Sequence, residues 1–272
     1  MKQQLLLLLV IMSALASPHT LSANKVLYVT HEPGRWHEYT PQLASFKEIA
    51  TQAKWELTVA TGSLEETLAF LGKKDFAAGQ DAIVYNFCLA DSTDLVAMTN
   101  LMRQTEEQGV PALLTHCSMH SWWSTYKKGK LIPGNPLGKA RANKKVLKAW
   151  QDSNPNTPLP AWGDFTGVAS TGHGRQKPIE VIASGDHPAT TGLPSRYTTA
   201  KTELYNNHYL TEDITPLAVG RQGKDEAIVM WLAPRGKGQI VGLTLGHGAD
   251  EWNDPVFRSL LINGVNYLLK SP

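Results

Sequence analysis

Cysteine is scarce in this chain, because only two of its 272 residues are Cys. This excludes a small disulfide-dense scaffold, and a chain of this length buries a substantial core without disulfide bonds. Charge of one sign is also lacking: 26 basic residues stand against 24 acidic ones, for a formal net charge of +2. No strong overall field attracts nucleic acid or a membrane surface, so we expect neither as a partner.

Long hydrophobic runs are absent as well, since none reaches the ~20 residues that a membrane-spanning helix requires. The apolar run 5–12 is short, follows the basic Lys2 and precedes small residues, a pattern typical of a secretory signal peptide. We expect residues 1–23 to be such a peptide, cleaved after Ala16 or after Ala23, and the alternative is an uncleaved helix. The mature protein is then periplasmic or secreted, without a membrane anchor.

Short apolar runs alternate with amphipathic segments along residues 25–116. Runs rich in β-branched and aromatic residues predict buried strands at 25–30, 56–60, 81–87 and 111–116. Apolar residues at spacings of three and four predict helices at 40–53, 64–71 and 94–108. Strands that alternate with helices form a parallel sheet with helices on both faces.

The second half of the chain departs from this alternation. Residues 122–171 show no clear pattern and include a basic stretch, 127–148, with eight Lys or Arg and no acidic residue. Such an insertion often serves as a lid or binding segment, although a solvated helix over 139–150 is the simpler interpretation. Further strands are predicted at 178–183, 214–220, 227–232 and 239–245, the last two as a hairpin, and a helix at 254–269. We expect one α/β domain over residues 24–272, with a mostly parallel central sheet and a hairpin-containing second half.

Histidine is unusually frequent, with nine residues. Imidazole transfers protons near neutral pH and binds metal ions. His31, His116 and His247 each follow a predicted strand, and the carboxyl ends of parallel strands border the ligand crevice. We therefore expect these three side chains at one site, although a single histidine in a loop is more often structural.

The order of these segments resembles the trehalose-utilisation (ThuA-like) family, a branch of the class I glutamine-amidotransferase-like fold. The resemblance rests on residues 29–31, Gly34, His37, residues 114–116, Trp123, Tyr126, residues 186–190, 192–194, 203–205, Trp231, residues 236–238, 245–247, Trp252 and residues 254–257. It implies a flavodoxin-like three-layer sandwich. The insertion at 122–171 is longer than the family's usual link, which leaves substrate size open.

The resemblance also implies a role in carbohydrate metabolism, on a disaccharide or a keto-sugar. We expect acid–base chemistry such as hydrolysis, elimination or isomerisation. The expected catalytic residues are His31, His116, Glu203 and His247, and the expected sugar contacts are His37, Trp123, Asp186, His187, Tyr205 and Trp252. A non-catalytic sugar-binding or accessory module is the alternative. The sequence does not indicate an oligomeric state.

Three histidines and a carboxylate also suit a divalent metal. Imidazole and carboxylate are ordinary zinc ligands, so His31, His116 and His247 with Glu203 indicate a possible zinc site. No compact metal motif accompanies them, and no other cofactor is indicated.

The sequence allows three different roles for the two cysteines, Cys88 and Cys117. Cys88 and Cys117 follow the third and fourth strands, which as sheet neighbours lie ~5 Å apart, within disulfide range. Two buried thiols are equally compatible with this placement. The resemblance to amidotransferases adds a third role, a Cys117 nucleophile with His247 and Glu251, because those enzymes carry a cysteine at the turn after a central strand. In this sequence His116 falls at that turn.

Overall fold

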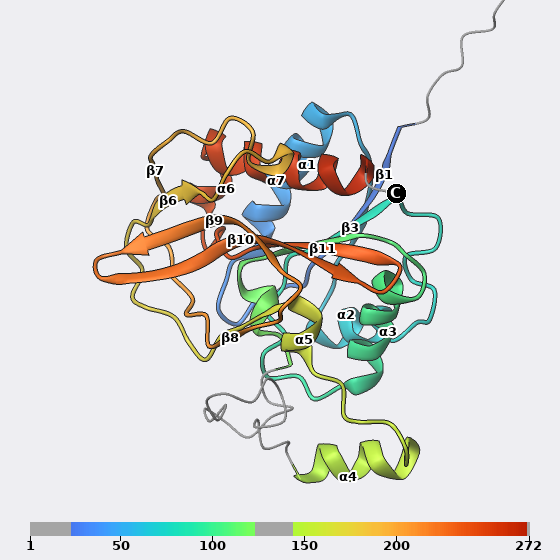
Figure 1. Cartoon of the computed structure of the whole chain (residues 1–272). Coiled ribbons are helices and arrows are strands. Elements are labelled where there is room, and N and C mark those ends of the chain that lie inside the picture. The colour runs from blue at the N-terminus through green and yellow to red at the C-terminus, as the bar shows by residue number, and fades with distance from the viewer. Residues whose placement is uncertain (1–22, 123–143, 271–272) are drawn as a thin grey trace, which may run out of the picture.

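The computed structural model describes residues 23–122 and 144–270, and it is built around a nine-stranded sheet (Figure 1). Five neighbouring strands are parallel, in the order β2 (Glu56–Ala60), β1 (Lys25–Val29), β3 (Ala82–Tyr85), β4 (Ala112–Thr115) and β11 (Gly238–Leu243). The order β2-β1-β3-β4 is that of flavodoxin-like sheets. The predicted α/β sandwich with a mostly parallel central sheet is confirmed.

The second half of the chain extends this sheet with antiparallel strands. These are β10 (Asp225–Arg235), which forms the predicted hairpin with β11, then β9 (Thr215–Gln222), β6 (Glu180–Ala183) and β7 (Tyr197–Thr198). Because direction alternates from β11 outward, β9 and β7 run with the parallel strands, and β10 and β6 run against them. The segment after β7 therefore emerges at the same sheet edge as those after β4 and β11. The segment after β6 emerges at the opposite edge.

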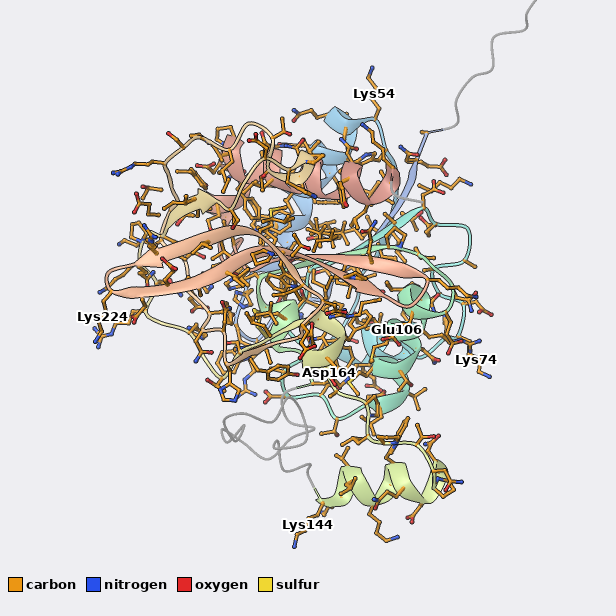
Figure 2. All side chains as sticks on the ribbon, viewed as in Figure 1. Lys54, Lys74, Glu106, Lys144, Asp164 and Lys224 are labelled. Atoms are coloured by element: carbon orange, nitrogen blue, oxygen red, sulfur yellow. A yellow bond between two sulfur atoms is a disulfide. The ribbon has the colours of Figure 1, made fainter. Side chains whose placement is uncertain are left out.

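Helices cover both faces of the sheet (Figure 1). One face carries α1 (Tyr39–Ala53), α6 (Ala249–Trp252) and α7 (Pro255–Lys270), and the other carries α2 (Leu64–Leu71), α3 (Leu95–Glu106) and α5 (Trp162–Thr166). Successive side chains of β1 supply both cores, because Val26 and Tyr28 enter the first and Leu27 and Val29 the second. Side chains fill both layers, whereas lysines such as Lys224 project from the periphery (Figure 2).

Polar side chains fix where the helices begin. Ser63 forms a capping box with Glu66 at the start of α2, and the Asp94 carboxylate accepts the Ala97 N–H at the start of α3. At α7 the Asp254 carboxylate accepts two backbone N–H groups of the first turn. These local signals explain why the helix positions are readable from the sequence.

Some expected features lie outside the described residues, namely residues 1–22 of the predicted signal peptide and residues 123–143 of the basic insertion. Helix α4 (Lys144–Ser153) falls partly within the helix expected over 139–150, and none of its side chains is buried. Among the described helices, none is long and apolar enough to cross a membrane. The pattern did not predict the short elements α5, α6, η1 (His116–His120), β5 (Val168–Ala169), η3 (Pro188–Thr190) and β8 (Tyr209–Leu210).

Candidate functional site at the carboxyl edge of the sheet

The candidate site begins at the sharp turn that follows β4. His116 stands at this turn with a φ of 41°, in the left-handed region that residues other than glycine seldom adopt. Its Nδ1 lies 2.7 Å from the carbonyl oxygen of Thr244, just past β11. Since a carbonyl only accepts, Nδ1 carries the proton and Nε2 presents its lone pair to the site.

His247 reaches the same point from the loop after β11. The loop turns at Gly246, whose φ is 102° and where a Cβ would lie 2.7 Å from the Phe257 ring. The Glu251 carboxylate accepts the backbone N–H groups of Gly246 and His247, at 3.0 and 2.7 Å. The Gln42 side chain donates to the carbonyl oxygen of His247 at 3.0 Å. The backbone that carries the imidazole is therefore held by two elements, α6 through Glu251 and α1 through Gln42.

Glu203 supplies the carboxylate, and it reaches the site because β7 runs with the parallel strands. Three atoms then form a triangle: His116 Nε2 and His247 Nδ1 are 3.1 Å apart, and Glu203 Oε2 lies 3.5 and 3.4 Å from them. Ligand atoms on one face of a tetrahedral zinc site are ~3.3 Å apart at ordinary Zn–N and Zn–O lengths of ~2.0–2.1 Å. These distances match that spacing.

The ring nitrogens also form a self-consistent hydrogen-bond relay without a metal. The Gln176 amide nitrogen lies 2.8 Å from His247 Nε2, and His247 Nδ1 faces the lone pair of His116 Nε2. Gln176 then donates to His247, which donates to His116, which donates to the Thr244 carbonyl. Metal binding requires the other tautomer of His247, with the proton on Nε2 and the Gln176 carbonyl turned toward it.

Burial sets the protonation of this cluster. It is the main cause that lowers the pKa of His116, and with smaller contributions from His116 and His247 it lowers the pKa of His37 to about 3. Burial alone would raise the pKa of Glu203, but interactions with His116 and His247 outweigh it and hold the pKa well below its usual range. Neutral imidazoles beside a charged carboxylate are the forms that ligate metal.

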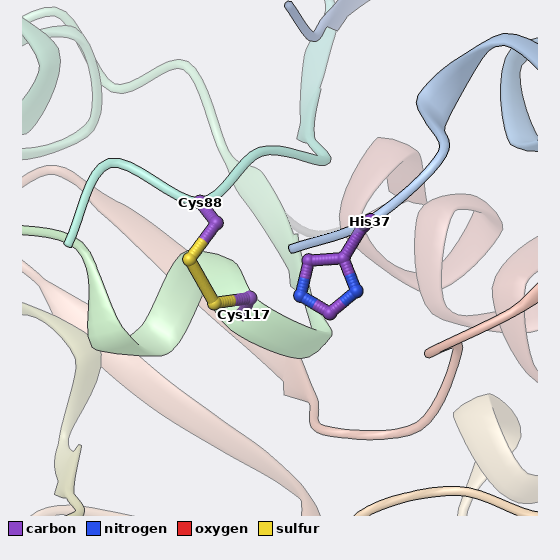
Figure 3. A group of neighbouring side chains, drawn as sticks. All are labelled: His37, Cys88 and Cys117. Carbon is purple, nitrogen blue, oxygen red and sulfur yellow. A yellow bond between two sulfur atoms is a disulfide. The ribbon is translucent and has the colours of Figure 1, made fainter. Parts of the chain in front are cut away.

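His37 extends the cluster toward the two cysteines. Its ring centroid lies 4.9 Å from that of His116 and 4.8 Å from that of His247, and ligand atoms of the three residues lie within 4.8 Å of one another. On its other side is a disulfide between Cys88 and Cys117, with 5.0 Å between the Cα atoms (Figure 3). We expected His37 as a sugar contact, and its burial places it instead among the histidines.

The amidase constellation is not assembled. Cys117 has no free thiol in this structure, because its sulfur is bonded to Cys88. Glu251 accepts backbone N–H groups, including that of His247, and no hydrogen bond or ion pair between these two described residues joins its carboxylate to the imidazole ring. The residue at the turn that follows the central strand is His116.

Two groups of expected site residues lie elsewhere. His31 is buried, with its ring 5.1 Å from that of Tyr39, and it does not belong to the group formed by His37, His116 and His247. Asp186 and His187 follow β6 and therefore lie at the opposite sheet edge, where the His187 ring contacts Tyr267 of α7 at 4.6 Å. They were expected as sugar contacts from the family resemblance, which does not give the direction of the strand before them.

Of the two tryptophans expected to face a sugar, the structure describes only Trp252, and it is not exposed. Trp252 is fully buried, and its indole N–H donates to the carbonyl oxygen of Gly246 at 2.9 Å, so it supports the His247 loop from inside the core. Trp123 lies outside the described residues. Trp36, which is 55% exposed beside His37, is the large aromatic side chain that the described part of this region presents to solvent.

Replacement of Trp252 by alanine is expected to lower the free energy of unfolding by about 3–5 kcal/mol, the usual cost of removing a buried Trp. The hydrogen bond to the Gly246 carbonyl is lost with it. Trp36→Ala is the matched control and should cost less than about 1 kcal/mol, since that ring is exposed. Denaturant titration measures both, and equal effects would contradict the assigned positions.

Three side chains that sequence reasoning did not place at the site border it. His120 and His173 pack against the Tyr205 ring, with centroids 4.6 and 5.1 Å away, and His173 Nδ1 is 3.5 Å from Glu203 Oε1. Gln176 contacts His247, as described above. Only His120 lies close to a predicted strand end, four residues after His116, so it is the only one of the three that this signal could have indicated. Tyr205, which the resemblance implies as a sugar contact, has its hydroxyl 3.5 Å from both His116 Nε2 and Glu203 Oε2.

The fold and the site define a flavodoxin-like α/β protein with a histidine at the turn after its fourth strand and an imidazole–carboxylate centre beside it. The sequence profile of the ThuA family, described as trehalose utilisation, matches residues 25–268. The chain belongs to this family. Its function is therefore related to carbohydrates in the broad sense.

Solved structures agree with the fold. A ThuA-like protein from Bacteroides uniformis aligns with a TM-score of 0.63 and 14% identity, over 94% of this chain and 95% of its own. A β-galactosidase from Rahnella sp. R3 aligns with a TM-score of 0.53 and 12% identity, over 90% of this chain and 31% of that enzyme. Among curated proteins, no sequence matches significantly.

Proposed function

We propose that this protein is an enzyme that processes a disaccharide or keto-sugar at a divalent metal ion, with zinc as the first candidate. His116 Nε2, His247 Nδ1 and Glu203 Oε2 are its ligands. The observation that carries the proposal is the triangle of 3.1, 3.4 and 3.5 Å between these atoms. Two imidazoles and one glutamate form a known catalytic zinc set that leaves a coordination position open.

The partners of each ligand atom support this assignment. The Thr244 carbonyl fixes the His116 tautomer that exposes Nε2, as an outer-sphere acceptor does for metal-bound histidine. The two nitrogens come from loops that follow adjacent parallel strands, β4 and β11, so their spacing is set by the sheet. His37 stands next to both rings as a further ligand or as a proton carrier.

The residues around the triangle suit a sugar. A cavity of about 500 Å³ shares His173 and Tyr205 with the site, and its other lining includes Asn206, Gln222 and Lys224. This volume lies in the range of small-molecule pockets, and amide and ammonium groups donate hydrogen bonds to hydroxyl oxygens. A disaccharide bound there places one ring among polar groups and the other near Tyr205.

A metal ion held by His116, His247 and Glu203 would polarise a carbonyl or hydroxyl oxygen of the sugar. The protein's own groups then handle the protons. Tyr205 presents a hydroxyl 3.5 Å from both a ligand nitrogen and the carboxylate, and His173 stands on the solvent side of Glu203. Proton removal next to a polarised carbonyl gives elimination or isomerisation, and protonation of a glycosidic oxygen gives hydrolysis.

The test is a panel of disaccharides and their keto forms, incubated with protein that has been stripped with a chelator and then reloaded with zinc or left empty. We expect conversion of at least one keto-sugar or disaccharide by the loaded protein and none by the stripped protein. Chromatography of the sugars measures it. Equal conversion with and without metal would contradict the metal centre. Binding of sugars without conversion of any would favour the non-catalytic module.

The proposal includes the predicted export of the chain, because a signal peptide over residues 1–23 fits a periplasmic or secreted carbohydrate enzyme. N-terminal sequencing of the protein from a secretion-competent bacterial host tests it. A mature start at residue 17 or 24 is expected.

A further inference from the structure

The disulfide and His37 together form a second constellation beside the triangle. Sulfur atoms of Cys88 and Cys117 and a ring nitrogen of His37 all lie within 4.8 Å of one another (Figure 3). Each of the three residues is less than 9% exposed. Three ligand-type atoms from three separate loops therefore meet in a small buried volume.

The sheet brings these residues together. Cys88 follows β3 and Cys117 follows β4, and these strands are neighbours in the parallel block. His37 comes from the loop between β1 and α1, which emerges at the same edge. The placement therefore depends on the fold and does not require the S–S bond.

His37 supplies the third ligand-type atom. It is 93% buried, and one of its ring nitrogens lies within 4.8 Å of both sulfur atoms (Figure 3). Neutral imidazole is an ordinary zinc ligand beside thiolates. In the oxidised protein the sulfurs next to it are bonded to each other and are poor ligands.

We propose that reduction of the Cys88–Cys117 disulfide creates a metal site in which Cys88, Cys117 and His37 hold a thiophilic divalent ion such as Zn²⁺. Two thiolates and one imidazole with an open fourth position are a known zinc donor set. An external dithiol breaks the S–S bond by supplying two electrons and two protons and becomes a disulfide itself. Binding of Zn²⁺ then releases the two thiol protons to solvent.

This site is distinct from the triangle of His116, His247 and Glu203 and does not rest on the proposed function. The two sets meet at His37, which stands between the cysteines and the other histidines. Reduction and oxidation therefore change which atoms around His37 can bind a metal. In oxidising surroundings the two cysteines form a disulfide bond, and in reducing surroundings they form an additional metal site with His37.

Cobalt(II) is the probe, because thiolate ligands give it a charge-transfer absorption that nitrogen and oxygen ligands do not. The protein is reduced with a water-soluble phosphine, which becomes the phosphine oxide by taking oxygen from water, and is desalted without oxygen before the titration. We expect the charge-transfer band in reduced wild-type protein and not in oxidised protein. Zinc should displace the cobalt and abolish the band.

The variants separate the two sites. Cys117→Ser should abolish the band, and His37→Gln should weaken cobalt binding by more than the 10–100-fold that loss of an outer-sphere partner costs. His247→Ala removes a triangle ligand and should keep the band, so failure of the proposed function leaves this result intact. His120→Gln, a nearby histidine outside both sets, is the matched control and should keep the band as well.

A second measurement covers variants that fold poorly. Alkylation of the two thiols in reduced wild-type protein should slow at least about 10-fold when zinc is present, as expected when a ligand occupies the thiolates. Reduced protein that binds cobalt without the band, or that alkylates equally fast with and without zinc, would overturn the proposal. So would a His37→Gln variant with unchanged cobalt affinity.

Discussion

Replacement of His116 by alanine is expected to lower zinc affinity of the oxidised protein by more than 100-fold and to lower sugar turnover by about 10²–10⁴-fold. The variant loses one of three ligand atoms, whereas loss of an outer-sphere partner alone already costs 10–100-fold in affinity. The range for turnover is that of a positioned acid–base group. Zinc retained after dialysis measures the first effect, and the sugar panel measures the second.

The Glu203→Gln variant tests whether zinc binding requires the negative charge of this side chain or only its size. The amide keeps the size of the side chain, but it removes the negative charge that lies within 3.5 Å of both His116 and His247. We expect zinc retention to fall as strongly as in His116→Ala. A gain or no change in zinc retention would show that the carboxylate is not a zinc ligand.

His187→Ala is the matched control for these variants. His187 follows β6 at the opposite sheet edge and contacts Tyr267 of α7. Its replacement should leave zinc retention and sugar turnover within a factor of two of the wild-type values. A loss equal to that of His116→Ala would mean that the effects report general destabilisation.

Acid is expected to destabilise the oxidised, metal-free protein, and His37 is expected to account for about 3 kcal/mol of the loss between pH 6.5 and pH 4. Burial, with smaller contributions from His116 and His247, lowers the pKa of His37 from its ordinary 6.5 to about 3. Between these values the unfolded chain binds a proton that the folded protein does not. The free energy of unfolding therefore falls as the pH drops through this window, by about 1.36 kcal/mol per unit.

Other groups contribute in both directions. Burial likewise lowers the pKa of His120 to about 3, which adds to the acid destabilisation. Burial raises the pKa of Glu251 to about 7, so the folded protein holds a proton more readily there and stability falls as the pH rises toward 7. Because these contributions partly offset each other, the total pH dependence does not isolate His37.

The difference between wild type and His37→Gln isolates it. The variant is expected to be less stable than wild type at pH 7, and the gap should shrink by about 3 kcal/mol at pH 4, since glutamine does not titrate. Urea unfolding in the presence of a chelator, at pH 7, 5.5 and 4, gives these values. A gap that stays constant across this range would show that folding does not lower the pKa of His37. His208→Gln, outside the site, is the control.

Much of the fold was predictable from the sequence because local signals carry it. The strand at β1 and the helix at α2 are short segments whose periodicity and caps are unambiguous, and the structure gives them the expected bounds within one or two residues. The short elements η1, β5 and β8 were not predictable. They are held by contacts with distant residues, such as the donation of the Trp162 indole N–H to the Ser118 carbonyl.

The site was predictable only in part. His116 and His247 follow strands of the parallel block, and the rule that ligands bind at carboxyl ends brings them together. Glu203 and Tyr205 were expected from the resemblance, because the short strand before them was not predicted. Asp186 and His187, also expected from the resemblance, lie at the opposite edge because the direction of β6 depends on its pairing with β9. That pairing joins residues about 40 positions apart, and no local pattern reveals it.

The sequence by itself determined the alternation of strands and helices, the histidines at strand ends and the family to which they point. These depend on residue type and spacing along the chain. Tertiary structure alone decided which imidazoles share a centre, because His37 lies beside His116 and His247 whereas His31 does not. It also buried Trp252 beneath the His247 loop and joined Cys88 to Cys117. The physical reason is that a metal or proton site requires atoms within about 3–4 Å of each other, and distances of that size are set by how strands pair and loops pack.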